Sequence, residues 1–301
     1  MSLYKLISPK SFAELLKKET ARRVIPVDST WYLPNSGKDG RKEFCEVERI
    51  PNSIYFDIDA IKDVESPYPH MLPSLKVFNE SMSELGVKKS DILVVYDRVG
   101  NFSAPRCAWT LGVFGHSPVY LLNNYITYKN EGYPIDQSIK TKFTEYAPTE
   151  YVSNTDFTPQ QVISYDQMLD MVKNGELAKK YNVFDARALP RFLGEAQEPR
   201  PGLPSGHIPG AQPMPFNEML NSGLFEGSEK EMKAKLDAYV SKSGVKFDPS
   251  KPTITMCGTG VSGVIIKTAL ELAGEKNLKL YDGSWTEWAL RANPEYIVKG
   301  S

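Results

Sequence analysis

A cysteine opens a short segment in which three of seven residues are glycine, Cys257-Gly258-Thr259-Gly260-Val261-Ser262-Gly263. Glycine lets the backbone curl so that successive N–H groups point inward, and such a ring of donors binds anions. A sulfur atom at its centre would lie in positive potential, which favours the thiolate, the reactive form of cysteine. The segment therefore predicts a nucleophilic cysteine, and the alternative is a buried structural cysteine beside a glycine-rich turn.

The residues on either side of this segment indicate how Cys257 is positioned. Residues 253–256 favour a β-strand, while residues 264–273 are apolar all round, as in a helix buried on a sheet. Cys257 thus lies between the end of a strand and the start of a helix. Backbone N–H groups and the helix dipole favour negative charge at that place.

The chain repeats itself once. Four short segments of the first half recur in the second half in the same order, at offsets of 157 to 160 residues. They pair Val27-Asp28 with Phe184-Asp185, Ile50-Pro51-Asn52-Ser53 with Ile208-Pro209-Gly210-Ala211, residues 93–97 with residues 253–257, and Leu121-Leu122-Asn123-Asn124 with Leu280-Tyr281-Asp282-Gly283. Four collinear matches predict two homologous domains, residues 1–147 and 160–301, joined by a linker at 148–159.

The fold class predicted for each half is α/β, with a parallel sheet flanked by helices. Short β-rich runs, at 24–27 and 92–96 in the first half and at 183–184 in the second, alternate with amphipathic stretches. Ser8 before Pro9 predicts a helix start, and Ser164 with Gln167 predicts a capping box. A surface helix is expected at 229–240, and an irregular, proline-rich loop at 191–205.

The glycine-rich segment resembles the loop CG(S/T)GV(T/S)(A/G) of 3-mercaptopyruvate sulfurtransferases, members of the rhodanese family. Other segments resemble that family in the same order along the chain: Phe56-Asp57-Ile58-Asp59, His70-Met71-Leu72-Pro73, Gly206-His207-Ile208-Pro209-Gly210-Ala211 and Tyr281-Asp282-Gly283-Ser284-Trp285. The resemblance implies a catalytic C-terminal domain and an N-terminal domain that has lost its cysteine. Asp97, which takes the place of Cys257 in the first half, agrees with this.

The resemblance also bears on the sulfur donor. Thiosulfate-preferring members resemble CRKGVTA, whereas this chain has Gly258 and Thr259 at the two basic positions. We therefore expect 3-mercaptopyruvate to be preferred and thiosulfate to be used less well. Arg191 and Arg200 match the arginines that hold the substrate carboxylate and keto oxygen, and a guanidinium suits that task; the alternative is that they are solvated loop charges. The loop residues Gly258, Gly260, Val261 and Ser262 complete the predicted substrate site.

Asp59, His70 and Thr259 match an Asp, His and Ser/Thr relay proposed for related sequences. A hydroxyl two residues after the cysteine could polarise the donor thiol or share its proton, and the alternative for His70 is a packed side chain at a domain interface. The chain departs from the family at Arg49, where a histidine is expected, and at Asn123-Asn124, where Asp-Gly is expected. Both departures lie in the half expected to be noncatalytic.

The expected reaction moves sulfur from a small donor to Cys257 as a persulfide, and then to a thiol, a thioredoxin-like acceptor or a protein in a sulfur relay for tRNA thiolation. No metal or organic cofactor is implied. One alternative is a rhodanese-like sulfur carrier that a partner protein loads. A cysteine phosphatase, the other rival, needs an arginine about six residues after its cysteine to clamp phosphate, and Gly263 stands there.

Composition limits the remaining possibilities. The 301 residues carry 36 Lys+Arg and 37 Asp+Glu, a formal charge of -1, so no global field draws the protein to nucleic acid or anionic lipid. Three cysteines without a CxxC pair argue against disulfides and metal sites. The apolar stretches are shorter than the roughly 20 residues of a membrane span, and the first ten residues lack a signal-peptide pattern. We expect a cytoplasmic protein, with mitochondrial residence left open.

Overall fold

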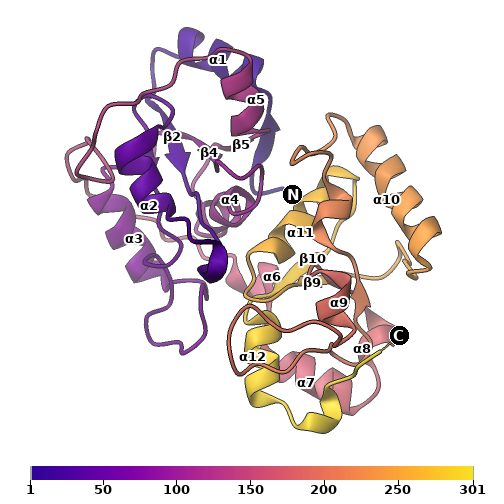
Figure 1. Cartoon of the computed structure of the whole chain (residues 1–301). Helices are drawn as coiled ribbons and strands as arrows, with labels where there is room; N and C mark the ends of the chain where they lie inside the picture. The colour runs from indigo at the N-terminus through magenta and orange to yellow at the C-terminus, as the bar shows by residue number, and fades with distance from the viewer. Residues whose placement is uncertain (1, 301) are drawn as a thin grey trace. The chain divides into compact units, whose positions relative to one another are not determined.

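The computed structural model describes residues 2–300, which pack as two compact units (Figure 1). The first unit comprises the chain up to Glu65, Leu72–Thr158 and Ser222–Leu224, and the remaining described residues form the second. The main division falls between Thr158 and Pro159, and residues 148–157 carry no helix or strand. Two short segments, 66–71 and 222–224, pack with the unit opposite to the one that their place in the sequence predicts.

The first unit is built on a five-stranded sheet with the strand order β1-β5-β4-β2-β3, in which all neighbours are parallel. The strands are β1 (Lys5–Ile7), β2 (Val24–Asp28), β3 (Ile54–Tyr55), β4 (Ile92–Tyr96) and β5 (Val119–Leu122). Every residue of β4 is buried, as expected for a central parallel strand that is covered on both faces.

The second unit repeats this sheet, with the order β6-β10-β9-β7-β8 and parallel neighbours throughout. The strands are β6 (Val162–Ile163), β7 (Asn182–Asp185), β8 (Gln212–Pro213), β9 (Thr253–Met256) and β10 (Leu278–Tyr281). The two sheets therefore correspond strand by strand, β4 with β9 and β5 with β10. This confirms the predicted fold class of two homologous α/β domains.

Helices cover the sheet of the first unit. In it α4 packs on β4 and β5, and α1 lies beside α5 (Figure 1). Ser8 caps α1 as predicted, because its hydroxyl accepts the backbone N–H of Ser11. The helices are α1 (Pro9–Lys18), α2 (Gly40–Lys42), α3 (Leu75–Glu84), α4 (Ala104–Val113) and α5 (Tyr125–Asn130), with the shorter turns η1 (Pro34–Ser36) and η2 (Glu43–Val47).

In the second unit α11 packs on β9 and β10, and α10 packs on α11. The capping box of Ser164 and Gln167 is present at the start of α7, as predicted. The helices are α6 (Thr158–Gln161, at the division), α7 (Tyr165–Lys173), α8 (Leu177–Lys180), α9 (Leu189–Phe192), α10 (Glu229–Ser243), α11 (Ser262–Leu272) and α12 (Ser284–Arg291), with the turns η3 (Phe216–Met219) and η4 (Pro294–Tyr296).

This architecture determines where a site can form. In open parallel sheets, ligands bind outside the carboxyl ends of the strands. The turns that leave the central strands β4 and β9 begin at Asp97 and Cys257, at the middle of that edge in each unit. Within residues 2–300, no helix is long and apolar enough to cross a membrane.

Candidate active site

Cys257 lies where the sequence places it, directly after β9 and before α11. Its side chain is buried, with 2% exposure. The loop turns at Gly260, whose φ of +75° is in the left-handed region that glycine adopts without strain. The N-cap residue of α11, Val261, makes no side-chain cap hydrogen bond, so the first N–H groups of this helix have no side-chain acceptor there. Such a helix end attracts an anion.

The start of α12 holds the same loop from its other side. The backbone N–H of Cys257 donates to Ser284 Oγ (3.1 Å), and the Cys257 carbonyl accepts the Trp285 N–H (2.9 Å). The Gly258 carbonyl accepts both the N–H (3.0 Å) and the hydroxyl (2.8 Å) of Thr286. Loop carbonyls thus satisfy N–H groups that the first turn of a helix leaves unpaired, and in return the peptide planes on both sides of Cys257 are fixed.

Arg191 reaches the loop from α9, so the predicted irregular segment 191–205 begins with a helical turn. A β-carbon added to Gly258 would lie 3.3 Å from Arg191 Nη2, which places the guanidinium over the residue that follows Cys257. Arg191 is also bonded to Glu198 through Nη2 (2.5 Å) and Nε (3.2 Å). Arg200, the second predicted donor-binding residue, is half-buried on the same loop, two positions after Glu198.

A neighbouring arginine has a different environment. The Arg187 guanidinium is bonded to the carboxylates of Asp185 and Glu198 and to the Gly206 carbonyl, and it stacks 4.4 Å from the Trp285 ring centroid. Burial opposes its charge, but the two carboxylates hold the pKa of Arg187 above its ordinary value. With these partners Arg187 supports the fold of the second unit.

The structure brings two of the three predicted relay residues together. His70 Nδ1 lies 3.0 Å from Thr259 Oγ1, and both side chains are buried. His70 has a φ of 62°, a conformation that costs free energy for a residue with a β-carbon and is enriched at functional sites. Although His70 lies early in the sequence, it packs with the second unit. Asp59 packs with the first unit, and there its Oδ2 accepts the Trp31 Nε1–H (2.9 Å).

The first unit contains the counterpart of the cysteine loop. The Asp97 carboxylate occupies its centre and accepts four backbone N–H groups, from Val99, Gly100, Ser103 and Ala104, at 2.7 to 2.9 Å. Burial raises the pKa of Asp97 in spite of these bonds. The strand-loop-helix turn of this fold therefore binds an anion through its backbone, and in the first unit the protein supplies that anion itself.

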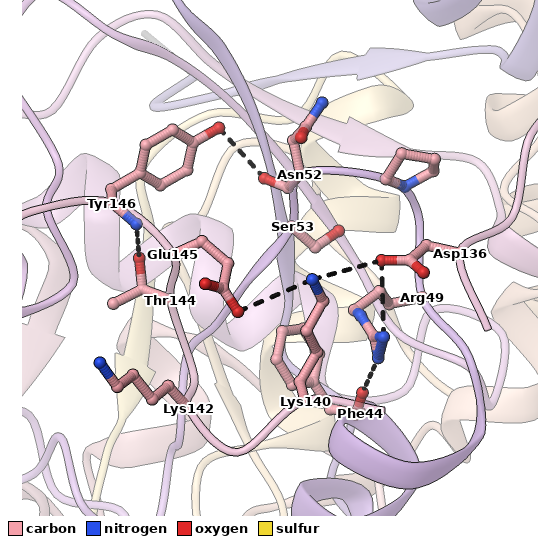
Figure 2. A pocket seen from close by; sticks show the side chains of 11 residues that line it. Phe44, Arg49, Asn52, Ser53, Asp136, Lys140, Lys142, Thr144, Glu145 and Tyr146 are labelled. Atoms are coloured by element: carbon pink, nitrogen blue, oxygen red, sulfur yellow. Dashed lines mark hydrogen bonds and ion pairs between the residues drawn. The ribbon is translucent and has the colours of Figure 1, made fainter. Parts of the chain in front are cut away.

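A pocket of about 150 Å³ lies in the first unit and includes none of the predicted site residues (Figure 2). Most of its charged side chains pair with one another: Lys140 lies 3.9 Å from Asp136 and 3.7 Å from Glu145, and Arg49 lies 3.5 Å from Asp136. Arg49, which replaces the expected histidine, is 1% exposed and also donates to the Phe44 carbonyl. These contacts make the pocket part of the structural network of the first unit.

Comparison with known proteins agrees with the resemblance of the loop. The model of the rhodanese-like domain matches residues 164–291. Thiosulfate sulfurtransferase TUM1 of Saccharomyces cerevisiae is 54% identical over 301 residues, which cover 99% of each chain. The chain belongs to the thiosulfate/3-mercaptopyruvate sulfurtransferase family. The crystal structure of the Saccharomyces cerevisiae Tum1 protein superposes with a TM-score of 0.96 over 99% of both chains.

Two further members of this sulfurtransferase family are similar over nearly the whole chain. The 3-mercaptopyruvate sulfurtransferase of Rattus norvegicus is 37% identical over 297 residues, covering 97% of this chain and 94% of its own. A sub-stoichiometric sulfur transferase subunit of yeast mitochondrial complex I is 38% identical, with a TM-score of 0.82, covering 99% of this chain and all of its own. The predicted family, tandem fold and sulfurtransferase activity are confirmed.

Sequence reasoning did not identify two groups at the site of this sulfurtransferase. One is Glu198, a buried carboxylate that joins Arg187 to Arg191. The other is the first turn of α12, which bonds to the loop. A glutamate between two arginines in a proline-rich loop was the available signal for the first. The second depends on contacts between segments 27 or more residues apart, to which no local pattern points.

Proposed function

We propose that Cys257 takes sulfur from 3-mercaptopyruvate, and less readily from thiosulfate, and carries it as a persulfide. The observation that carries this proposal is the position of Cys257 in a buried loop between β9 and the uncapped start of α11. The matching turn of the first unit binds the Asp97 carboxylate through four N–H groups. A turn of this kind is suited to stabilise a thiolate and the terminal sulfur of a persulfide.

The donor is held beside the sulfur by two arginines. Arg191 lies over Gly258 and Arg200 follows on the same loop, so both are suited to the carboxylate and keto oxygen of 3-mercaptopyruvate. The residues Gly258, Gly260, Val261 and Ser262 form the wall of the donor site. Because position 258 is glycine, no basic side chain extends from it toward the sulfonate-like end of thiosulfate.

The chemical step exchanges one bond for another. The Cys257 thiolate attacks the donor sulfur, an S–S bond forms, and the bond between the donor's sulfur and carbon breaks. The electron pair leaves as the pyruvate enolate, which takes up a proton to give pyruvate. In this proposal Thr259, which is hydrogen-bonded to His70, shares the proton of the donor thiol, and Asp59 is the third member of the relay. The step as written needs no metal or organic cofactor.

The two domains have different roles in this proposal. The C-terminal domain, 160–301, carries out catalysis, and the N-terminal domain, 1–147, is noncatalytic because Asp97 stands where the nucleophile would be. Residues 148–159 are the linker. The acceptor is a small thiol, a thioredoxin-like protein, or a protein cysteine in a sulfur relay that ends in tRNA thiolation. We propose a cytoplasmic protein that also resides in mitochondria, and one relative, a subunit of yeast mitochondrial complex I, supports the mitochondrial part.

The intact mass of the purified protein after brief exposure to each donor tests this function. We expect one added sulfur on the wild type, removable by a thiol and loaded fastest by 3-mercaptopyruvate, and none on Cys257→Ser. Cys45→Ser is the matched control, since Cys45 is a half-exposed cysteine of the first unit. Faster loading by thiosulfate would reverse the donor preference. No loading by either donor, together with uptake from a partner protein, would indicate a sulfur carrier.

A further inference from the structure

The two arginines that share Glu198 differ in how many of their N–H groups the protein already uses. Arg187 donates from Nε and Nη2 to Asp185, from Nη1 to Glu198 and from Nη2 to the Gly206 carbonyl, and is 2% exposed. Within residues 2–300, Arg191 donates from Nε and Nη2 only, and both bonds end on Glu198 Oε2. The Arg187 side chain is 1% exposed, so a ligand cannot reach the one Nη1 N–H that these bonds leave, whereas the Arg191 side chain is 21% exposed and keeps three N–H groups that can bind a ligand.

The geometry of the Glu198 bonds decides which edge of Arg191 is offered. A guanidinium presents a side edge, Nε with Nη2, and an end edge, Nη1 with Nη2, and either can grip a carboxylate with two parallel bonds. Glu198 occupies the side edge. The end edge, formed by Nη1 and the second N–H of Nη2, is left for a ligand beside Gly258.

Glu198 is itself held in place. Its side chain is 2% exposed, and its second oxygen, Oε1, accepts Arg187 Nη1 at 2.7 Å. Because Arg187 is fixed by Asp185 and by the Trp285 ring, the Glu198 carboxylate cannot rotate without breaking that bond. The rigid part of the second unit is thus connected through one carboxylate to the side chain that lies over the cysteine loop.

We propose that Glu198 is a positioning residue for the sulfur donor, which orients the free end edge of Arg191 toward a donor carboxylate. This inference rests on the proposed role of Arg191 in binding the donor. It predicts a specificity effect, because an oriented planar edge matches a planar carboxylate better than a tetrahedral sulfonate-like group. Loss of Glu198 should therefore weaken 3-mercaptopyruvate binding more than thiosulfate binding.

The test is the steady-state kinetics of Glu198→Gln with both donors, in the wild-type and in the Arg191→Ala background. In the wild-type background we expect the KM for 3-mercaptopyruvate to rise roughly 10-fold with kcat within about twofold, the effect of one charge-assisted bond. The KM for thiosulfate should rise less. In the Arg191→Ala background the same change should leave KM where Arg191→Ala alone puts it, because Glu198 acts through Arg191.

Two further variants separate positioning from folding. Asp91→Asn is the matched control, since Asp91 is a buried carboxylate bonded to Arg23 Nε (2.9 Å) and Nη2 (2.5 Å) in the first unit. It should lower the melting temperature without changing either KM. Glu198→Asp keeps the charge and shortens the side chain by one methylene, so it should fold and still raise the KM for 3-mercaptopyruvate.

The kinetic results distinguish the role of Glu198 from the role of Arg191. A wild-type KM for Glu198→Gln, or an equal rise in both backgrounds, would overturn the role of Glu198 while leaving the cysteine chemistry intact. A wild-type KM for Arg191→Ala would overturn the donor role of Arg191, and the inference with it. Neither result affects the mass test of Cys257, which decides the proposed function separately.

Discussion

The turn that starts at Asp97 and the turn that starts at Cys257 are two versions of one structure held by opposite means. In the first unit a carboxylate fills the centre and accepts four backbone N–H groups. In the second, the first turn of α12 holds the loop by the carbonyls of Cys257 and Gly258. Both loops turn at a glycine with positive φ, Gly100 and Gly260. A carboxylate of the protein stabilises the first turn from within, whereas bonds from a neighbouring helix stabilise the second turn and do not involve the side chain of its first residue.

Substitutions of Asp97 and Cys257, the first residues of the two turns, test this difference most directly. Asp97→Ala leaves four N–H groups of a buried turn without their acceptor, and should cost about 4 kcal/mol of unfolding free energy. Sulfur loading of Cys257 should continue in the molecules that remain folded. Cys257→Ser should do the reverse, abolishing loading at a cost below about 1 kcal/mol. Denaturant unfolding and intact mass of both variants check this, and equal stability losses would show that the turns are held alike.

A second difference concerns the aspartates that end β2 and β7. In the second unit Asp185 pairs with Arg187, whereas in the first unit the matching position of Arg187 is Thr30. Burial raises the pKa of Asp28 to about 6, and hydrogen bonds from Thr30 offset this only in part. The pKa of Asp28 is thus higher in the folded than in the unfolded state. The contribution of Asp28 to the free energy of unfolding is therefore fully present below about pH 4 and is lost as the pH rises through about 6.

Asp28→Asn should therefore stabilise the protein by about 2 kcal/mol at pH 8 and by almost nothing at pH 4. Asp185→Asn, the matched change in the second unit, should destabilise it at pH 8, because Arg187 would lose a paired charge. Unfolding free energies measured at the two pH values check both signs. A pH-independent effect of Asp28→Asn would mean that Asp28 is ionised in the fold without penalty.

One substitution makes the loop that starts at Cys257 more like the loop that starts at Asp97. Thr259 corresponds to Val99, so Thr259→Val removes the hydroxyl that contacts His70 and keeps the shape. We expect the loading rate of Cys257 to fall roughly 10-fold, the value of a hydrogen bond made at the reacting group, and Thr259→Ser to restore it. Rapid-quench mass measurements give the rate. If His70→Gln lowers the rate further in the Thr259→Val background, the two residues do not act as one relay.

The smallest expected effect tests whether the units unfold separately. Ser8 caps α1 with one bond, and Ser164 caps α7 with a reciprocal capping box. Ser164→Ala should cost about 1 kcal/mol and Ser8→Ala somewhat less, each in its own unit. Fluorescence and hydrogen exchange recorded across the same denaturant series would assign each loss. Identical shifts of both units by either variant would show that they unfold as one.

What could be predicted from the sequence was local or repeated. The capping residues, the strand before Cys257 and the helix after it depend on residues within one turn of each other, and the duplication supplied the second sheet from the first. The bonds from α12 to the loop and the packing of His70 with the second unit join segments distant in sequence. Only the folded chain specifies these contacts, because many alternative pairings satisfy the same local pattern.

The attachment of the cysteine loop to α12 has a consequence for the free energy of sulfur transfer at Cys257. Ser284, Trp285 and Thr286 anchor the peptide groups on both sides of Cys257 through backbone atoms of the loop and not through the sulfur. In the proposed cycle the same fixed dipoles would therefore face the sulfur before and after it takes up a second sulfur, and little reorganisation would accompany the transfer. The cysteine loop would then have nearly the same free energy with and without the transferred sulfur. The direction of sulfur transfer would be set by the concentrations of donor and acceptor.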